Sequence, residues 1–207
     1  ANLRLRQTRD LEVTYAGAEA SVAASICNFG GVARYVTALP KHALAEATMD
    51  TLRAVGIDTQ FVLRTDSGRL GLYFLETGAN QRPSNVIYDR ADSAIACTAG
   101  DKYNWDAIFD DAQWLHLSGI TPALSKEAAA ATLLAAKKAK EAGVTVSCDL
   151  NFRKKLWNWD SSKPARELAE ETMRGILPHL DVVIANEEYC SDVLGIHAAD
   201  TDVNAGT

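Results

Sequence analysis

Hydrophobic and polar positions follow one simple pattern in the second half of the chain. After residue 104, short runs rich in apolar residues alternate with segments in which apolar residues recur every three to four positions. Strands are expected at 113–118, 144–149 and 181–185, and helices at 105–110, 125–142, 162–177 and 187–194. Because a helix between two strands usually makes them parallel, this half predicts a parallel sheet with helices on both faces.

The pattern before residue 56 also predicts strands and helices. Alternating apolar residues indicate a strand within 2–15, and a short strand is expected at 34–39. One helix is expected after the small-residue corner at 16–18, and another over 44–55; glycines end both. The residues expected to face inward are Val22, Ile26 and Phe29 on the first helix, and Leu44, Thr48, Leu52 and Val55 on the second.

Residues 60–89 have a different pattern. Three strand-like runs, at 60–64, 71–76 and 84–89, are separated only by short turn segments. Loops this short permit antiparallel hairpins and exclude the crossovers of parallel strands. The sequence therefore predicts a small β-meander that forms a lid on an α/β core within one incomplete domain. This domain spans residues 1–207. Its lid strands are expected at about 2–15 and 60–90, and its core at about 16–56 and 104–196.

Composition and charge argue against several classes of protein. The net charge of −6 disfavours a nucleic-acid or membrane-surface partner, since such partners require a basic face. No apolar run in the sequence approaches the length that spans a bilayer. The four cysteines are scattered without a CxxC motif, and the four histidines lack metal-ligand spacing. These features predict a cytoplasmic protein without a disulfide or zinc framework.

A polar cluster follows the strand predicted at 144–149. Asp149, Asn151 and Arg153 place a carboxylate, an amide and a guanidinium at the carboxyl end of that strand. Open α/β sheets bind ligands at this edge, and a guanidinium offers a planar fork for a carboxylate or a phosphate. We therefore expect Asn151 and Arg153 to bind substrate, with Asp149 orienting Arg153. The alternative is that these side chains only cap the ends of the strand and its loop.

Two further candidate sites lie in the first half of the chain. Gly17, in the small-residue turn before a helix, would let a ligand approach the backbone amides closely, although such turns also serve packing alone. Tyr73 lies in one predicted lid strand, and Tyr88 and Arg90 share one face of the next. A phenol and a guanidinium on one face suit a hydroxylated substrate with a carboxylate. The alternative is an aromatic–arginine pair on a surface edge strand.

Six segments together resemble the ribokinase-like carbohydrate kinases, and more narrowly the 2-keto-3-deoxygluconate kinases. They occur in the order found in that family and span nearly the whole chain. The segments are YAGAEASVA at 15–23, GLYFL at 71–75, VIYDR at 86–90, LSGITPAL at 117–124, DLNFRKKLW at 149–157 and ANEE at 185–188. The resemblance implies a three-layer α/β/α sandwich with a β-sheet lid. It also implies ATP-dependent phosphorylation of 2-keto-3-deoxygluconate at its terminal hydroxyl.

The same resemblance implies a role for each candidate substrate-binding residue. Gly17 would present its backbone to the sugar hydroxyls, and Tyr73 and Tyr88 would line the sugar pocket from the lid. Arg90 and Arg153 would hold the substrate carboxylate from two sides.

ATP and Mg²⁺ are the cofactors that the resemblance implies. Asn186 would lie near the ATP phosphates and their Mg²⁺, and Glu187 and Glu188 would contact the metal through water. The partners expected are a small sugar acid, ATP and a second copy of the chain. Pairing of two lids in a homo-oligomer would bury the alternating apolar face of the lid, formed by Leu72, Phe74 and Ile87.

The sequence departs from the family pattern at Ala16, Ser21, Ala45 and Tyr189. Gly is usual in place of Ala16 and Ala45, and Asn is usual in place of Ser21. Tyr189 stands at the acidic position of the Asn-x-x-acid motif that organises Mg²⁺. The family's opening strand, its Gly-Ala-Gly-Asp motif and its adenine-binding segments are absent, and 204–207 resembles a loop. We therefore expect a fragment that lacks the catalytic base and does not turn over substrate alone.

Two alternatives remain open from the sequence. One is a related sugar kinase with a neutral substrate, such as a fructokinase. Two guanidinium groups converging on a neutral sugar would leave charge unpaired in a desolvated pocket, which argues against this alternative. The other is a truncated or degenerate sugar-binding protein without catalysis, which the departures at Ser21 and Tyr189 favour.

Overall fold

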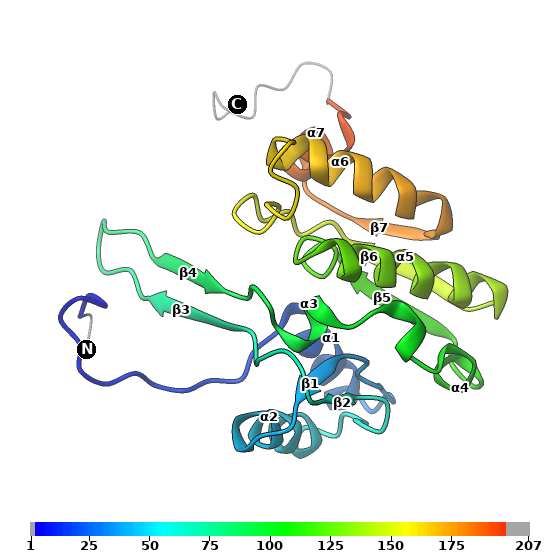
Figure 1. Cartoon of the computed structure of the whole chain (residues 1–207), viewed down its shortest axis with the longest axis horizontal. Helices are drawn as coiled ribbons and strands as arrows, with labels where there is room; N and C mark the ends of the chain where they lie inside the picture. The colour runs from blue at the N-terminus through cyan, green and yellow to red at the C-terminus, as the bar shows by residue number, and fades with distance from the viewer. Residues whose placement is uncertain (1–2, 198–207) are drawn as a thin grey trace. The chain divides into compact units, whose positions relative to one another are not determined.

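Short sheets and the helices between them make up the computed structural model, which describes residues 3–197 (Figure 1). The chain divides into two compact units, Ala1–Ala94 and Ile95–Thr207. Parallel strands occur in both units, and the first unit also holds a small antiparallel pair. The predicted α/β class is thus confirmed. The loop expected at 204–207 lies outside the described residues.

The first unit contains a parallel pair of strands joined by a helix. β1 (Ala38–Pro40) pairs with β2 (Leu63–Thr65), and α2 (Ala43–Ala54) crosses between them. Two apolar clusters form the core of this unit. The buried members of these clusters are Leu39, Ala45, Met49 and Val62 in one, and Ala23, Leu52 and Ile57 in the other.

The expected three-stranded meander is wrong. β2 belongs to the parallel pair, because the Leu63 N–H donates to the Thr37 carbonyl at 2.9 Å and brings this run beside β1. Of the three runs, only the second and third pair with each other, as β3 (Leu72–Glu76) and β4 (Asn85–Asp89) in an antiparallel ribbon separate from the parallel pair (Figure 1). The short turn between the runs permitted a hairpin but did not require one.

The strand expected within 2–15 is also wrong for the residues described. Residues 3–15 contain no strand, and the N–H groups of Gln7 and Thr8 both donate to the Arg4 carbonyl in a turn. Leu11 and Val13 are exposed. Alternating apolar residues form a stable strand only where a neighbouring strand or a core receives them. Within residues 3–15 the Leu5 N–H donates to the Glu76 side chain at 2.9 Å, not to the backbone of a neighbouring strand.

The buried face of α1 (Ala18–Asn28) differs from the predicted one. Phe29 is 92% exposed, and Val22 and Ile26 are also exposed. Small residues make the contacts instead: Ala23 is buried, with Ala20, Ala24 and Cys27 packed around it. On α2, Leu52 is buried as expected, whereas Leu44 and Val55 are exposed.

The second unit is built on a three-stranded parallel sheet in the order β5-β6-β7. Its strands are β5 (Trp114–Ser118), β6 (Thr145–Asp149) and β7 (Val182–Ile184). The crossovers contain α5 (Lys126–Glu141) and α6 (Ala165–Ile176), which lie side by side in Figure 1. The remaining elements are α3 (Ala94–Cys97), η1 (Gly100–Lys102), α4 (Trp105–Phe109), η2 (Leu177–His179) and α7 (Glu187–Leu194).

The predicted βα order of this unit is confirmed, and β6 is its central strand. Ser125 caps α5 as expected, since its Oγ accepts a hydrogen bond from the Ala128 N–H at 2.9 Å. Only α3 and the short η segments were not anticipated. Within residues 3–197, no helix combines the length and the apolar composition that crossing a bilayer requires. This arrangement places the polar cluster after β6 at the carboxyl edge of the sheet.

Candidate functional site

The chain turns sharply where β6 ends at Asp149. The Asp149 Oδ1 accepts a hydrogen bond from the Asn151 N–H at 3.0 Å. Asn151 is only 7% exposed and has a φ of 36°, in the left-handed region that Asn tolerates better than most residues. Among residues 3–197, the Asp149 carboxylate therefore contacts the backbone of the turn that carries Arg153 rather than the guanidinium itself.

A glycine allows a second loop to pass against this turn. The Gly119 N–H donates to the Asp149 carbonyl at 2.8 Å. A Cβ at Gly119 would lie 2.1 Å from the Leu150 carbonyl oxygen, far inside van der Waals contact. The loops after β5 and β6 can therefore approach only if this position has no side chain.

Arg153 contacts the start of α7. Its Nη1 donates to the Tyr189 Oη at 2.5 Å and to the Phe152 carbonyl at 3.2 Å. Its Cζ lies 6.0 Å from the centroid of the Tyr189 ring, within the range of a cation–π contact. The structure thus joins the end of β6 to the first turn of α7, a contact that sequence reasoning missed.

Asn186 caps α7. Its Oδ1 accepts a hydrogen bond from the Tyr189 N–H at 2.7 Å, which satisfies one of the unpaired donors at the helix start. Glu187 and Glu188 follow in the first turn and are exposed, where negative charge is favourable to the helix dipole. The nucleotide role expected for Asn186 remains a prediction.

The residues described do not by themselves enclose a metal ion. Across residues 3–197, no three His, Cys, Asp or Glu side chains gather closely enough to hold one. Glu187 and Glu188 are exposed carboxylates at a helix start, and such oxygen donors fit Mg²⁺ that keeps most of its water ligands. Their metal role stays a prediction.

Gly17 begins α1 without a side-chain cap. It has φ −174° and ψ 144°, an extended conformation, and its position faces the Tyr35 hydroxyl: a Cβ there would lie 3.6 Å from that oxygen. The Ser21 hydroxyl donates to the Gly17 carbonyl at 2.8 Å, so it is turned back onto the helix. The first-turn amides of α1 are therefore not covered by a capping side chain.

The β3–β4 ribbon brings three predicted residues together. Tyr73 and Tyr88 are direct partners in the ladder, so their side chains share one face. The Arg90 Cζ lies 5.7 Å from the centroid of the Tyr73 ring and 5.3 Å from that of Tyr88. The guanidinium therefore contacts both aromatic rings and is held in place by two cation–π interactions.

Tyr35 is a candidate that sequence reasoning missed. Burial raises the pKa of its phenol above the ordinary value; the Glu19 carboxylate raises this pKa further, and the Arg90 guanidinium lowers it. The hydroxyl thus lies near Gly17 and within electrostatic reach of Arg90. The only signal in the sequence is a polar-tipped aromatic residue in a short, otherwise mostly aliphatic run.

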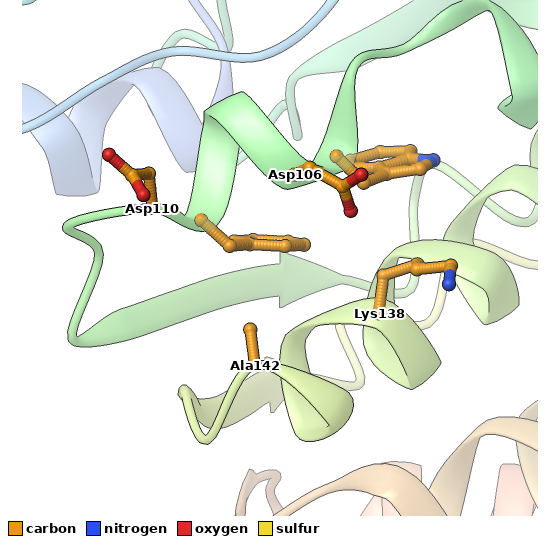
Figure 2. Close-up of a pocket in the computed structure, with 6 residues that line it drawn as sticks. Asp106, Asp110, Lys138 and Ala142 are labelled. Atoms are coloured by element: carbon orange, nitrogen blue, oxygen red, sulfur yellow. The ribbon is translucent and has the colours of Figure 1, made fainter.

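A surface pocket of about 250 Å³ lies within the second unit, between α4 and α5 (Figure 2). Asp106 and Lys138 face each other across it, and Ala142 lies at its end. Because Ala142 leads directly into β6, this pocket is at the amino end of that strand. It is therefore at the edge of the sheet opposite Asp149, and we do not assign it to the candidate site.

The predicted residues are brought together within each unit. Tyr73, Tyr88 and Arg90 meet in the first unit, and in the second unit Arg153 and Asn186 both contact Tyr189. The expectation that Arg90 and Arg153 hold one carboxylate from two sides remains a prediction.

Comparison with known proteins relates the chain to sugar kinases. Residues 3–205 match the profile of the pfkB family carbohydrate kinases. A 2-dehydro-3-deoxygalactonokinase of Haloferax volcanii is 38% identical over 191 residues, which cover 92% of this chain and 57% of the relative. A 2-dehydro-3-deoxygluconokinase of Bacillus subtilis is 32% identical over 143 residues, covering 69% of this chain and 44% of the relative.

A solved structure shows the same similarity in three dimensions. The crystal structure of a 2-dehydro-3-deoxygluconokinase from Thermotoga maritima superposes with a TM-score of 0.89 and 45% sequence identity. The alignment covers 96% of this chain and 59% of that one. The chain thus spans about half the length of the curated relatives it matches.

Proposed function

Because the chain belongs to the pfkB family of carbohydrate kinases, we propose that the protein transfers the γ-phosphoryl group of ATP to the terminal hydroxyl of a 2-keto-3-deoxy sugar acid. Its fold is ribokinase-like. The leading substrate is 2-keto-3-deoxygluconate, and its C4 epimer 2-keto-3-deoxygalactonate is the second candidate. Relatives named for each of these sugar acids support the pair. We place the reaction in the cytoplasm.

The observation that carries this proposal is the Arg90 guanidinium against the rings of Tyr73 and Tyr88. Aromatic faces hold the guanidinium plane while its edge donors remain suited to an anion. A carboxylate on the substrate would pair with this charge, and Arg153 supplies a second guanidinium. A neutral sugar would leave such charges unpaired at a desolvation cost, which disfavours a fructokinase-like function.

Phosphoryl transfer requires mainly positioning and charge neutralisation from the protein. When bound, ATP supplies the phosphoryl group, and Mg²⁺ neutralises charge on its phosphates. Arg90 and Arg153 would fix the acid end of the sugar, and the amides beside Gly17 would meet its hydroxyls. Asn186 would stand near the phosphates. We do not assign the general base to Asp149, because its Oδ1 accepts the Asn151 N–H.

Sugar-dependent ADP release tests the proposal. The intact protein would be assayed with ATP, Mg²⁺ and each of 2-keto-3-deoxygluconate, 2-keto-3-deoxygalactonate and fructose. We expect kcat/KM for at least one sugar acid to exceed that for fructose by about a hundredfold or more, since two charge-assisted contacts depend on the carboxylate. Preference for fructose would contradict the proposal. Binding of a sugar acid without ADP release would support the sugar-binding alternative.

A further inference from the structure

Some of the N–H donors of Arg153 already form hydrogen bonds within the protein. A guanidinium carries five N–H donors, two of them on Nη1. The Arg153 Nη1 donates to the Tyr189 Oη at 2.5 Å and to the Phe152 carbonyl at 3.2 Å. Both donors of this nitrogen therefore have partners within the same unit.

The remaining donors determine which edge of Arg153 can meet a ligand. A carboxylate binds a guanidinium with two parallel contacts, either across Nη1 and Nη2 or across Nε and Nη2. Within residues 3–197, both hydrogen bonds of the Arg153 side chain leave from Nη1. Only the Nε/Nη2 edge therefore keeps two parallel donors for an incoming carboxylate.

Tyr189 is itself anchored. Its N–H donates to the Asn186 Oδ1 at 2.7 Å, which fixes the residue in the first turn of α7. Its side chain is partly buried, whereas Glu187 and Glu188 beside it are exposed. The ring and the hydroxyl of Tyr189 both contact Arg153, and these two contacts restrict rotation of the guanidinium.

The chemistry of a phenol suits this position. A carboxylate here would neutralise the Arg153 charge and compete with an anionic ligand. The neutral Tyr189 hydroxyl accepts one hydrogen bond and leaves the positive charge in place.

We propose that Tyr189 is a positioning residue for Arg153, and that it sets the Nε/Nη2 edge as the one that binds the substrate carboxylate. The inference rests on the proposed function, because it assumes a sugar acid as the ligand.

Tyr189→Phe in the intact protein tests this role, since it removes the hydroxyl and keeps the ring. Isothermal titration with 2-keto-3-deoxygluconate should show about threefold to tenfold weaker binding, the effect of one lost hydrogen bond. The uncharged carboxamide of the same sugar should lose less affinity, and ATP affinity should stay within about twofold. The matched control is Tyr103→Phe, because the buried Tyr103 hydroxyl has no hydrogen-bond partner in the structure described; it should bind the sugar acid like the wild type.

A double-mutant cycle separates positioning from general structural support. In the Arg153→Lys background, Tyr189→Phe should weaken sugar-acid binding by less than about twofold, because Tyr189 acts through the guanidinium. Wild-type affinity in Tyr189→Phe, or an equal loss for the acid, the carboxamide and ATP, would overturn the inference alone. Failure of the wild type to bind either sugar acid would overturn the proposed function, and this inference with it.

Discussion

Tyr73 and Tyr88 face each other directly in the β3–β4 ladder, and the Arg90 guanidinium lies against both of their rings. Side chains alternate between the two faces of a strand, so the neighbouring apolar residues project to the opposite side of the ribbon. Leu72 and Ile87 on that side are exposed, at 38% and 49%. One face of the ribbon therefore carries the predicted substrate contacts, and the other leaves apolar surface uncovered.

We predict that this apolar face pairs two copies of the protein. Replacing Ile87 with Lys would place a charge in the interface and should shift the intact protein toward the monomer in sedimentation velocity experiments. Leu44→Lys is the control, because Leu44 is an equally exposed leucine on α2. A wild-type protein that stays monomeric at high concentration would refute the pairing.

Arg153→Lys should weaken binding of 2-keto-3-deoxygluconate by about tenfold to a hundredfold. Lys keeps the charge but cannot reproduce the two-pronged donor edge, nor the contact of Nη1 with the Tyr189 Oη. ATP affinity should barely change, since the carboxylate is at the opposite end of the sugar from the attacking hydroxyl. Titration of both ligands checks this. Unchanged sugar binding with weaker ATP binding would instead assign Arg153 to the phosphates.

Two Gly→Ala substitutions should affect different properties, stability at Gly119 and sugar binding at Gly17. At Gly119 the new Cβ would lie 2.1 Å from the Leu150 carbonyl, so we expect a loss of about 1–3 kcal/mol in the free energy of unfolding. At Gly17 the nearest atoms would be 3.5 and 3.6 Å away, an ordinary contact, and the φ of −174° suits any residue. Gly17→Ala should therefore keep its stability and lose affinity for the sugar.

Urea unfolding and sugar titration of both variants check this pair of expectations. A stable Gly119→Ala protein would show that the loops after β5 and β6 can separate without cost. Full sugar affinity in Gly17→Ala would remove that residue from the proposed site.

The free energy of unfolding should decrease in acid as Asp181 becomes protonated. Its Oδ1 pairs with the Lys140 Nζ at 2.6 Å and its Oδ2 accepts the Val146 N–H at 2.8 Å, and these contacts lower the pKa of the carboxyl below its usual value of 3.8. The lowered pKa means that the contribution is present above about pH 4 and is lost as the pH falls through the folded-state pKa. Asp181→Asn should thus be less stable than the wild type at pH 7.

The difference in the free energy of unfolding between the wild type and Asp181→Asn should become smaller as the Asp181 carboxyl is protonated. Chemical denaturation at pH 7 and at about pH 3 measures it. An equal difference at both pH values would mean that packing, and not the charge, makes the contribution.

Local signals in the sequence were enough to predict the second unit. The Ser125 cap, the basic last turn of α5 and Gly143 bound that helix within one residue, and α7 has the predicted limits of 187–194. The cluster after β6 was predictable because chain order alone puts it at the carboxyl edge of a parallel sheet.

The first unit was predicted less well because its signals depend on partners. The run at 60–64 has the composition of a strand, but whether it pairs with β1 or β3 is decided by tertiary contacts. On α1, the apolar pattern indicated Val22 and Ile26 as the buried face because they are large. The small residue Ala23 is the one that packs into the core. The contact of Arg153 with Tyr189 spans 36 positions, so no local pattern could indicate it.

The cap on α7 has a consequence for genetics. Asn186 holds the backbone of Tyr189, and the side chain of Tyr189 holds Arg153. A variant such as Asn186→Ala would therefore loosen the first helical turn and release the guanidinium at the same time. If Asn186 and Arg153 have the roles proposed for them, the phenotype would combine a nucleotide defect with a sugar defect. A screen that scores growth alone would then attribute to one ligand a fault that belongs to both.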